Sequence, residues 1–340
     1  MEREENFQRQ VSFDGAGAPN AEEVVHPDGL PRESNGPQKR DGIIRRFIRR
    51  RSKGDIIFDI INYTLVTVIC LLLVYPFLYM ISVSLTGKDN VSDVILWPVG
   101  VPNFNAYIFI FKMDNILRGF GNTFLYTFVS LAFSMVLTVG LAYAMSKKFL
   151  VGKKLLNIFV LITMYFSGGL IPTYITITSL GMVDNIWAMT IPAAINTYNM
   201  IVMRTYFMSS VPDELEEAAE MDGAGTIRTL VSVYLPLSMP ILMTIGLFYF
   251  VASWNSWFGA QIYLDTPEKY PIQLILRNAL ESTLAQGMNS SMMNELYANA
   301  IDGNSLNYAL TIVVTLPLLI LFPFLQKFFV KGVIVGSLKG

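Results

Sequence analysis

The sequence predicts an all-α polytopic membrane protein, and three observations support this fold class. Hydrophobic residues make up 53% of the 340-residue chain, whereas charged residues make up only 15%. Several apolar runs approach the length of roughly 20 residues that a helix needs to cross the hydrocarbon core of a bilayer. The runs are continuous, whereas a membrane β-barrel would show alternating segments of about ten residues. Helices are therefore expected throughout the membrane.

Two segments are expected ahead of the membrane. Residues 1–42 are rich in Gly, Pro, Asn and Glu and poor in large apolar side chains, which is typical of a disordered tail. Residues 43–55 form a basic segment directly before the first apolar run. The tail lacks the basic region and adjoining apolar stretch of a secretory signal, so the first span is expected to be an uncleaved anchor.

Six transmembrane helices fit the apolar runs of residues 56–340. The third of them contains Gly168, Gly169 and Pro172, which are expected to break or bend it. Broken helices occur where backbone lines a cavity, and simple packing of a small-residue kink is the alternative explanation. The predicted spans cover residues 56–84, 120–145, 155–179, 186–206, 235–260 and 306–328.

Basic residues between the spans predict the orientation, because Lys and Arg gather in the cytoplasmic connections of membrane proteins. When both termini are placed in the cytoplasm, all but a few Lys and Arg residues lie inside. The exceptions are Lys88, Lys112, Arg118, Lys269 and Arg277. Both termini are therefore expected to be cytoplasmic.

This orientation puts an acidic hairpin, residues 210–234, on the cytoplasmic face. Pro212 suits the first turn of a helix, and the acidic residues that follow favour the positive end of the helix dipole. Gly223 suits the stop, and a second short helix is expected from Thr226, with Ile227, Leu230 and Val231 turned towards the membrane domain. Pro236 is expected to mark the entry into the fifth span.

The hairpin is interpreted as a docking site for a soluble cytoplasmic partner. Leu215, Ala218 and Ala219 share one face of the predicted helix, and the two alanines keep that face thin enough for a groove on another protein. The alternative is a helix that lies at the membrane surface without a partner. Helices of that kind usually carry Lys and Arg rather than a run of acids.

Several motifs resemble those of the permease subunits of binding-protein-dependent ABC importers. Glu217-Ala218-Ala219 with Gly223, followed by Val233-Tyr234-Leu235-Pro236, resembles the signature cytoplasmic loop of that family. Further motifs resemble its carbohydrate-uptake branch, the maltose-permease type, and within it the LplC/YtcP-like group. These are Asn122-Thr123, Gly168-Gly169-Leu170-Ile171-Pro172, Trp254-Asn255-Ser256-Trp257 and the closing residues 331–340.

The resemblance implies a type I ABC importer permease fold and a set of partners. The implied partners are a second homologous permease, which forms a heterodimer with this chain, and two ABC ATPase subunits, which bind ATP and Mg. An external solute-binding protein is also implied. The chain itself would bind no cofactor or metal and catalyse no reaction. It would lie in the bacterial cytoplasmic membrane, in contact with lipid and not with nucleic acid. The residues implied to couple to the ATPase are Glu216, Glu217, Ala218, Ala219, Asp222, Gly223 and Ala224.

Two absences in the sequence agree with energy supplied by another subunit. No Gly-x-x-x-x-Gly-Lys-Ser/Thr phosphate-binding loop occurs. The central parts of spans two to six carry no Asp, Glu, Lys, Arg or His, whereas ion-coupled carriers commonly use such residues. An ion-coupled secondary transporter and a channel-like membrane protein are the alternatives.

Polar and aromatic residues at mid-membrane depth are candidates for the path of a carbohydrate. At about 1.5 Å rise per residue, Tyr165, Ser167, Asn196, Tyr198 and Asn199 are expected near the middle of the bilayer. Hydrogen bonds between helices are the alternative role for the asparagines.

Trp254, Asn255 and Trp257 are further path candidates, expected near the outer end of the fifth span, where Asn255 with Ser256 and Gln261 would line a vestibule. Tryptophans of an aromatic belt are the alternative. The external loop 261–305 is long, and its Pro, Gly and Asn residues suggest an exposed excursion. By resemblance, residues from roughly 265 to 300 would meet the binding protein, with a plain solvated loop as the alternative.

Overall fold

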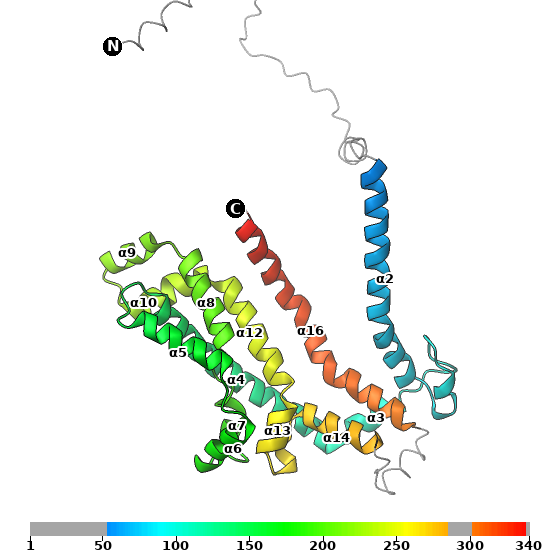
Figure 1. The fold of residues 1–340 in the computed structure, drawn as a ribbon. Coiled ribbons are helices and arrows are strands. Elements are labelled where there is room, and N and C mark those ends of the chain that lie inside the picture. The colour runs from blue at the N-terminus through cyan, green and yellow to red at the C-terminus, as the bar shows by residue number, and fades with distance from the viewer. Residues whose placement is uncertain (1–52, 285–300, 338–340) are drawn as a thin grey trace, which may run out of the picture. The chain divides into compact units, whose positions relative to one another are not determined.

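A computed structural model describes residues 53–284 and 301–337, and within them every regular element is a helix (Figure 1). The described residues fall into two compact units, with the boundary between Thr67 and Val68 inside the first helix, and the packing described below lies in the second unit. The predicted tail, residues 1–42, and nearly all of the basic segment 43–55 lie outside the described residues.

The longer helices are α2 (Lys53–Ser84), α3 (Asn105–Lys112), α4 (Asp114–Ser146), α5 (Lys153–Tyr165), α6 (Leu170–Ser179), α8 (Thr197–Ser210), α9 (Asp213–Met221), α12 (Met239–Trp254), α14 (Ile272–Leu284) and α16 (Gly303–Ser337). The short elements are η1 (Lys88–Asp93), α7 (Ile186–Thr190), α10 (Thr226–Thr229), η2 (Leu230–Tyr234), α11 (Leu235–Leu237), α13 (Trp257–Tyr263) and η3 (Pro267–Lys269).

Three of the described helices are long and apolar enough to cross a membrane: Gly54–Ser84, Asp114–Ser146 and Gly303–Pro323. Two sharply bent helix pairs raise the number of candidate spans to five if each pair counts as one span. The all-helical prediction is therefore confirmed for the described residues, while the number of six spans stays a prediction.

The third predicted span is broken where its glycines predict a break. α5 ends at Tyr165, α6 begins at Leu170, and the two axes differ by 109°. Gly169 has φ of 87° and ψ of 177°, a conformation in which a β-carbon would clash with the backbone.

The fourth and fifth predicted spans are also interrupted. Residues 191–196 separate α7 from α8, because Pro192 cannot donate the backbone hydrogen bond of a continuing helix. The fifth span begins at Met239 rather than near Pro236. The chain turns by 87° at the buried Ser238, ahead of Pro240 at the start of α12.

α4 is the central helix of the packed unit and contacts α8, α12 and α14, while α12 also packs against α16 (Figure 1). One buried cluster joins α3, the start of α4, α14 and α16, and includes Ile110, Ile116, Ile272, Leu310 and Val314. A second joins the end of α4, α8, the hairpin and α12, and includes Met145, Met200, Phe207, Tyr234 and Ile245. α4 thus contributes to both clusters.

The described part of the external loop 261–305 differs from the exposed excursion that the sequence suggests. Residues 272–284 form α14, and Ile272, Leu274 and Leu276 of this helix are buried. Ile272 and Leu276 share one side of α14 and belong to the cluster with α3, α4 and α16. Leu274 lies on another side and packs with Tyr126, Ala260 and Leu264. Residues 285–300 of the loop lie outside the described residues.

Candidate functional site

The acidic hairpin begins with a locally encoded helix, α9. Pro212 precedes it with φ of −63° and ψ of 138°, and Asp213, Glu214 and Glu216 fill its first turn. Negative side chains there interact favourably with the unpaired N–H groups of the helix start.

The end of α9 is a Schellman motif centred on Gly223. The Gly223 N–H donates to the Glu220 carbonyl at 2.9 Å, and the Ala224 N–H donates to the Ala219 carbonyl at 2.9 Å. Gly223 has φ of 76°, which is the left-handed conformation that this motif requires. The stop at Gly223 and the second helix from Thr226 agree with the sequence prediction.

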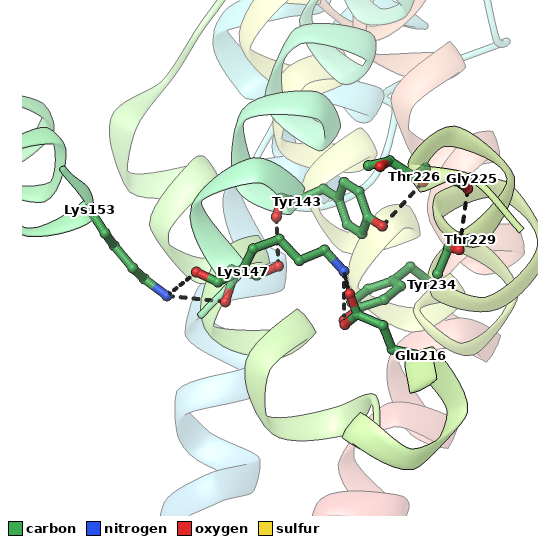
Figure 2. Close-up of polar contacts among 9 residues, drawn as sticks. Tyr143, Lys147, Lys153, Glu216, Gly225, Thr226, Thr229 and Tyr234 are labelled. Carbon is green, nitrogen blue, oxygen red and sulfur yellow. Dashed lines mark hydrogen bonds and ion pairs between the residues drawn. The ribbon is translucent and has the colours of Figure 1, made fainter. Parts of the chain in front are cut away.

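A buried ion pair fastens α9 to the end of α4 (Figure 2). The Lys147 ammonium contacts Oε1 of Glu216, and the two side chains are only 7% and 15% exposed. The Tyr234 hydroxyl donates to Oε2 of the same carboxylate at 2.7 Å. Both oxygens of Glu216 therefore have partners inside the chain, and removing one member of such a pair typically costs about 3–5 kcal/mol.

Two aromatic rings enclose the Lys147 ammonium. It lies 4.0 Å from the ring centroid of Tyr143 and 4.3 Å from that of Tyr234, and the two rings meet edge to face at 4.9 Å. Although burial acts to lower it, the pKa of Lys147 is raised because hydrogen bonds to Glu216, Tyr143 and Tyr234 stabilise the ammonium. Lys147 is thus held in its charged form in a largely buried contact on the wall of a cleft between α9 and the ends of α4 and α8.

The other predicted coupling residues present a different side of α9. Glu217, Ala218, Asp222 and Gly223 are exposed, whereas Ala219 and Ala224 are half-buried. A cleft of about 360 Å³ runs between α9 and the ends of α4 and α8. Its lining includes Lys148, Phe149, Met208, Glu217 and Glu220.

The second arm of the hairpin corrects one expectation. Ile227 is 78% exposed and Val231 is 55% exposed, so neither side chain turns inward. Thr229 and Tyr234 are the buried residues of this arm, and Leu230 is half-buried against the cluster that includes Phe207 and Tyr234, as expected.

The structure separates the path candidates of the third and fourth predicted spans. Tyr165, Ser167 and Tyr198 are exposed, and Asn199 is buried. Ser167 Oγ accepts a hydrogen bond from the Gly169 N–H at 3.2 Å, at the break between α5 and α6. Asn196 caps α8, since its side-chain oxygen accepts from the Asn199 N–H at 3.0 Å.

The candidates near the end of α12 also differ from one another. Trp254 is fully buried between Phe124, at 5.2 Å, and Phe250, at 5.9 Å, so its ring reaches neither a solute nor lipid. Asn255 accepts a hydrogen bond from Gln273 at 2.8 Å. Trp257 is half-buried, and the Arg277 guanidinium stacks 3.7 Å from its ring centroid.

Lys147, Tyr143 and Arg277 were not predicted as site residues. Arg277 entered the sequence prediction only as a basic residue placed outside, and Lys147 only as one of the basic residues placed in the cytoplasm. The four-residue spacing of Tyr143 and Lys147 places both on one face of α4, and this is the local signal that could have revealed their contact.

Comparison with known proteins gives consistent matches. A family model described as binding-protein-dependent transport system inner membrane component matches residues 42–335. The chain is 35% identical to the polygalacturonan/rhamnogalacturonan transport system permease protein YtcP of Bacillus subtilis (strain 168), over 84% of this chain and 99% of that protein. It is 34% identical to protein LplC of the same organism, over 85% of this chain and 97% of that protein.

A solved structure is also similar. It is the crystal structure of a bacterial ABC transporter involved in the import of the acidic polysaccharide alginate. The TM-score is 0.78 and the sequence identity is 32%, over 82% of this chain and 99% of the matched chain.

Proposed function

This chain belongs to the family of binding-protein-dependent transport system inner membrane components, and we propose that it forms half of the translocation path for a carbohydrate. It is a permease subunit of an ABC importer, not an enzyme, and the family does not favour the ion-coupled carrier or the channel. The names of the similar permease and of the similar importer, which refer to polysaccharides, support an oligosaccharide as the substrate.

The observation that carries the proposal is the way the chain fixes its acidic hairpin. Glu216 is held inward by Lys147 and Tyr234, whereas Glu217 and Asp222 remain exposed. In this proposal Glu217 and Asp222, together with Ala218, Ala219, Gly223 and Ala224, form the docking surface for an ATPase subunit. Closure of the two ATPases would then push on α9.

The proposed assembly contains two permeases, two ATPases and an external binding protein. The second permease is a homologue rather than a copy, and the ATPases bind ATP and Mg. The complex lies in the cytoplasmic membrane of a bacterium. Residues 56–340 form six spans with both termini inside, the hairpin 210–234 lies in the cytoplasm, and the external loop 261–305 meets the binding protein.

The exposure of each side chain reduces the set of residues proposed to line the solute path. Tyr165, Ser167 and Tyr198 have exposed side chains, so each offers a hydroxyl group to a sugar. Asn255 and Trp257 remain candidates for the outer vestibule. Trp254 is withdrawn, because a fully buried ring has no surface to offer.

Affinity copurification from the native membrane tests the proposal, with valine substitutions at two glycines of the hairpin. Gly223→Val forces a β-branched residue to φ of 76°, which disrupts the end of α9. Gly225→Val is the matched control, because Gly225 has φ of −74° and ψ of 167° and open space around its Cα.

Wild type and Gly225→Val are expected to retain an ATPase and a second permease, while Gly223→Val keeps the permease and loses the ATPase. A wild-type chain that purifies alone and carries solute in vesicles would contradict the assembly. Full retention of the ATPase by Gly223→Val would contradict the docking role of the hairpin.

A further inference from the structure

We propose that Lys147 is a positioning residue that binds the cytoplasmic hairpin to the end of α4, so that α4 moves together with the hairpin. The inference rests on the proposed docking of an ATPase at the hairpin. According to this inference, α4 moves with the hairpin, in addition to α12, which follows the hairpin directly in the chain.

The first arm of the hairpin is attached through Glu216. This carboxylate points inward although the neighbouring Glu214 and Glu217 are exposed, and it binds Lys147 and Tyr234 at the same time. The adjacent pair of Lys148 and Asp213 is different, because its side chains are 79% and 60% exposed. An exposed pair is screened by water and contributes little, so the buried pair is the firm attachment of the two.

The second arm is attached to the same turn of α4. The Tyr143 hydroxyl donates to the Thr226 carbonyl at 3.2 Å, and the Tyr143 ring packs edge to face on Tyr234 (Figure 2). Phe207 of α8 packs edge to face on Tyr234 at 5.6 Å. The Lys147 ammonium lies over the rings of Tyr143 and Tyr234, and this places one cation at the point where both arms meet α4.

The connection that follows α4 holds this turn in place. The Lys153 ammonium donates to the Lys147 carbonyl at 2.8 Å and to the Ser146 carbonyl at 3.1 Å. Ser146 is the last residue of α4 and Lys147 is the capping residue that follows it, and the last carbonyls of a helix have no partners inside the helix. The end of α4 is therefore anchored by its own neighbours as well as by the hairpin.

α4 is suited to carry the movement further. It runs unbroken from Asp114 to Ser146, which corresponds to about 50 Å at 1.5 Å per residue. Near its start, Asn122 donates to the carbonyls of Glu268 and Tyr270 at 2.7 and 3.1 Å, and Tyr126 donates to that of Lys269 at 2.9 Å. α4 thus contacts the hairpin at its C-terminal end and binds the segment before α14 near its N-terminal end.

The test compares paired neutral variants of the complete transport complex in proteoliposomes. Lys147→Met with Glu216→Gln removes both buried charges together, so that neither is left unpaired. Lys148→Met with Asp213→Asn removes the neighbouring exposed pair and is the matched control. Lys147→Arg keeps the buried charge.

ATP hydrolysis and solute uptake are measured on the same vesicles. The buried double variant is expected to keep the ATPase bound and hydrolysing ATP but to transport about tenfold less solute per ATP, a coupling change of the size seen along physical networks. The exposed double variant is expected to match wild type, and Lys147→Arg is expected to fall between the two. Wild-type transport per ATP in the buried double variant would overturn the inference while leaving the proposed function intact.

A distance measurement decides the same point without removing the pair. Spin labels are placed at Glu214→Cys on α9 and Ala144→Cys on α4, both exposed, with the chain's one cysteine replaced by Cys70→Ser. The distance between the labels is expected to stay constant between the nucleotide-free and ATP-bound complexes. A distance that changes on ATP binding would show that the hairpin slides on α4, and the inference would be wrong.

Discussion

The Asp184 carboxylate and the Lys269 ammonium form an ion pair that joins the turn before α7 to the segment before α14. The same carboxylate accepts hydrogen bonds from the Asp265 and Thr266 N–H groups at 3.2 and 3.1 Å and from the Thr266 hydroxyl at 2.6 Å. Asp184 has φ of 58°, and among the described non-glycine residues it alone has a positive φ. One side chain thus organises the segment that reaches α14.

Loss of this carboxylate is expected to destabilise the protein in a pH-dependent way. Hydrogen bonds from Lys269 and Thr266 hold the pKa of Asp184 well below its usual range. A depressed pKa means that the contribution to stability is fully present above the ordinary aspartate pKa of about 4 and is lost as the pH falls below it. Asp184→Asn should therefore lower the melting temperature in detergent at pH 6–8, and the difference from wild type should shrink below about pH 4.

Asn is the informative replacement because it tolerates a positive φ as well as Asp does. Asp184→Ala adds backbone strain and should melt at a lower temperature than Asp184→Asn. A difference between wild type and Asp184→Asn that is the same at about pH 2.5 and at pH 7 would mean that the carboxylate does not act through its charge.

Thr123 is expected to hold the first residue of α14. Its side chain is 1% exposed, its hydroxyl donates to the Gly119 carbonyl at 2.8 Å, and it accepts from the Ile272 N–H at 2.8 Å. Thr123→Val keeps the shape but leaves this buried N–H without its acceptor, which should cost about 1–3 kcal/mol. Thermal unfolding in detergent measures the loss.

Thr123→Ser is the control, because it keeps the hydroxyl and removes one methyl group. It should be more stable than Thr123→Val. A Thr123→Val variant as stable as wild type, beside a destabilised Thr123→Ser, would mean that the methyl group, not the hydrogen bond, supports α14.

Local signals made the hairpin predictable. The start and stop of α9 depend on Pro212, the acidic first turn and Gly223, all of which act within a few residues. The break beside Gly169 was predictable for the same reason. The apolar runs predicted helices because the bilayer imposes a length on any segment that crosses it.

Contacts between distant residues were not predictable in this way. Lys147 belongs to a lysine-rich connection that looks solvated, and its burial depends on Tyr234, which lies 87 residues further along the chain. The role of α14 was missed because its apolar residues are interleaved with polar ones in a segment that also resembles a loop. Trp254 was misplaced because depth along a helix does not specify which side the ring faces.

Trp254 is expected to act as a core residue without a role in solute binding. Its Nε1 group has no hydrogen-bond partner in the described residues, so Trp254→Phe loses no hydrogen bond and keeps the packing on Phe124 and Phe250. This variant should retain the wild-type KM for uptake. Trp254→Ala should cost about 3–5 kcal/mol, because it leaves a large cavity. A raised KM in Trp254→Phe, with an unchanged melting temperature, would return Trp254 to the solute path.

The proposed orientation predicts which exposed residues can be labelled from outside the cell. Val101 is 88% exposed in the connection assigned to the outside, and Val151 is 92% exposed in the connection assigned to the cytoplasm. On a Cys70→Ser background, a membrane-impermeant maleimide should label Val101→Cys in intact cells and Val151→Cys only after the membrane is opened. The two valines are almost equally exposed, so unequal labelling reports the membrane and not local burial. The reverse pattern would invert the topology and place the hairpin, with Glu217, on the side of the membrane that ATPase subunits cannot reach.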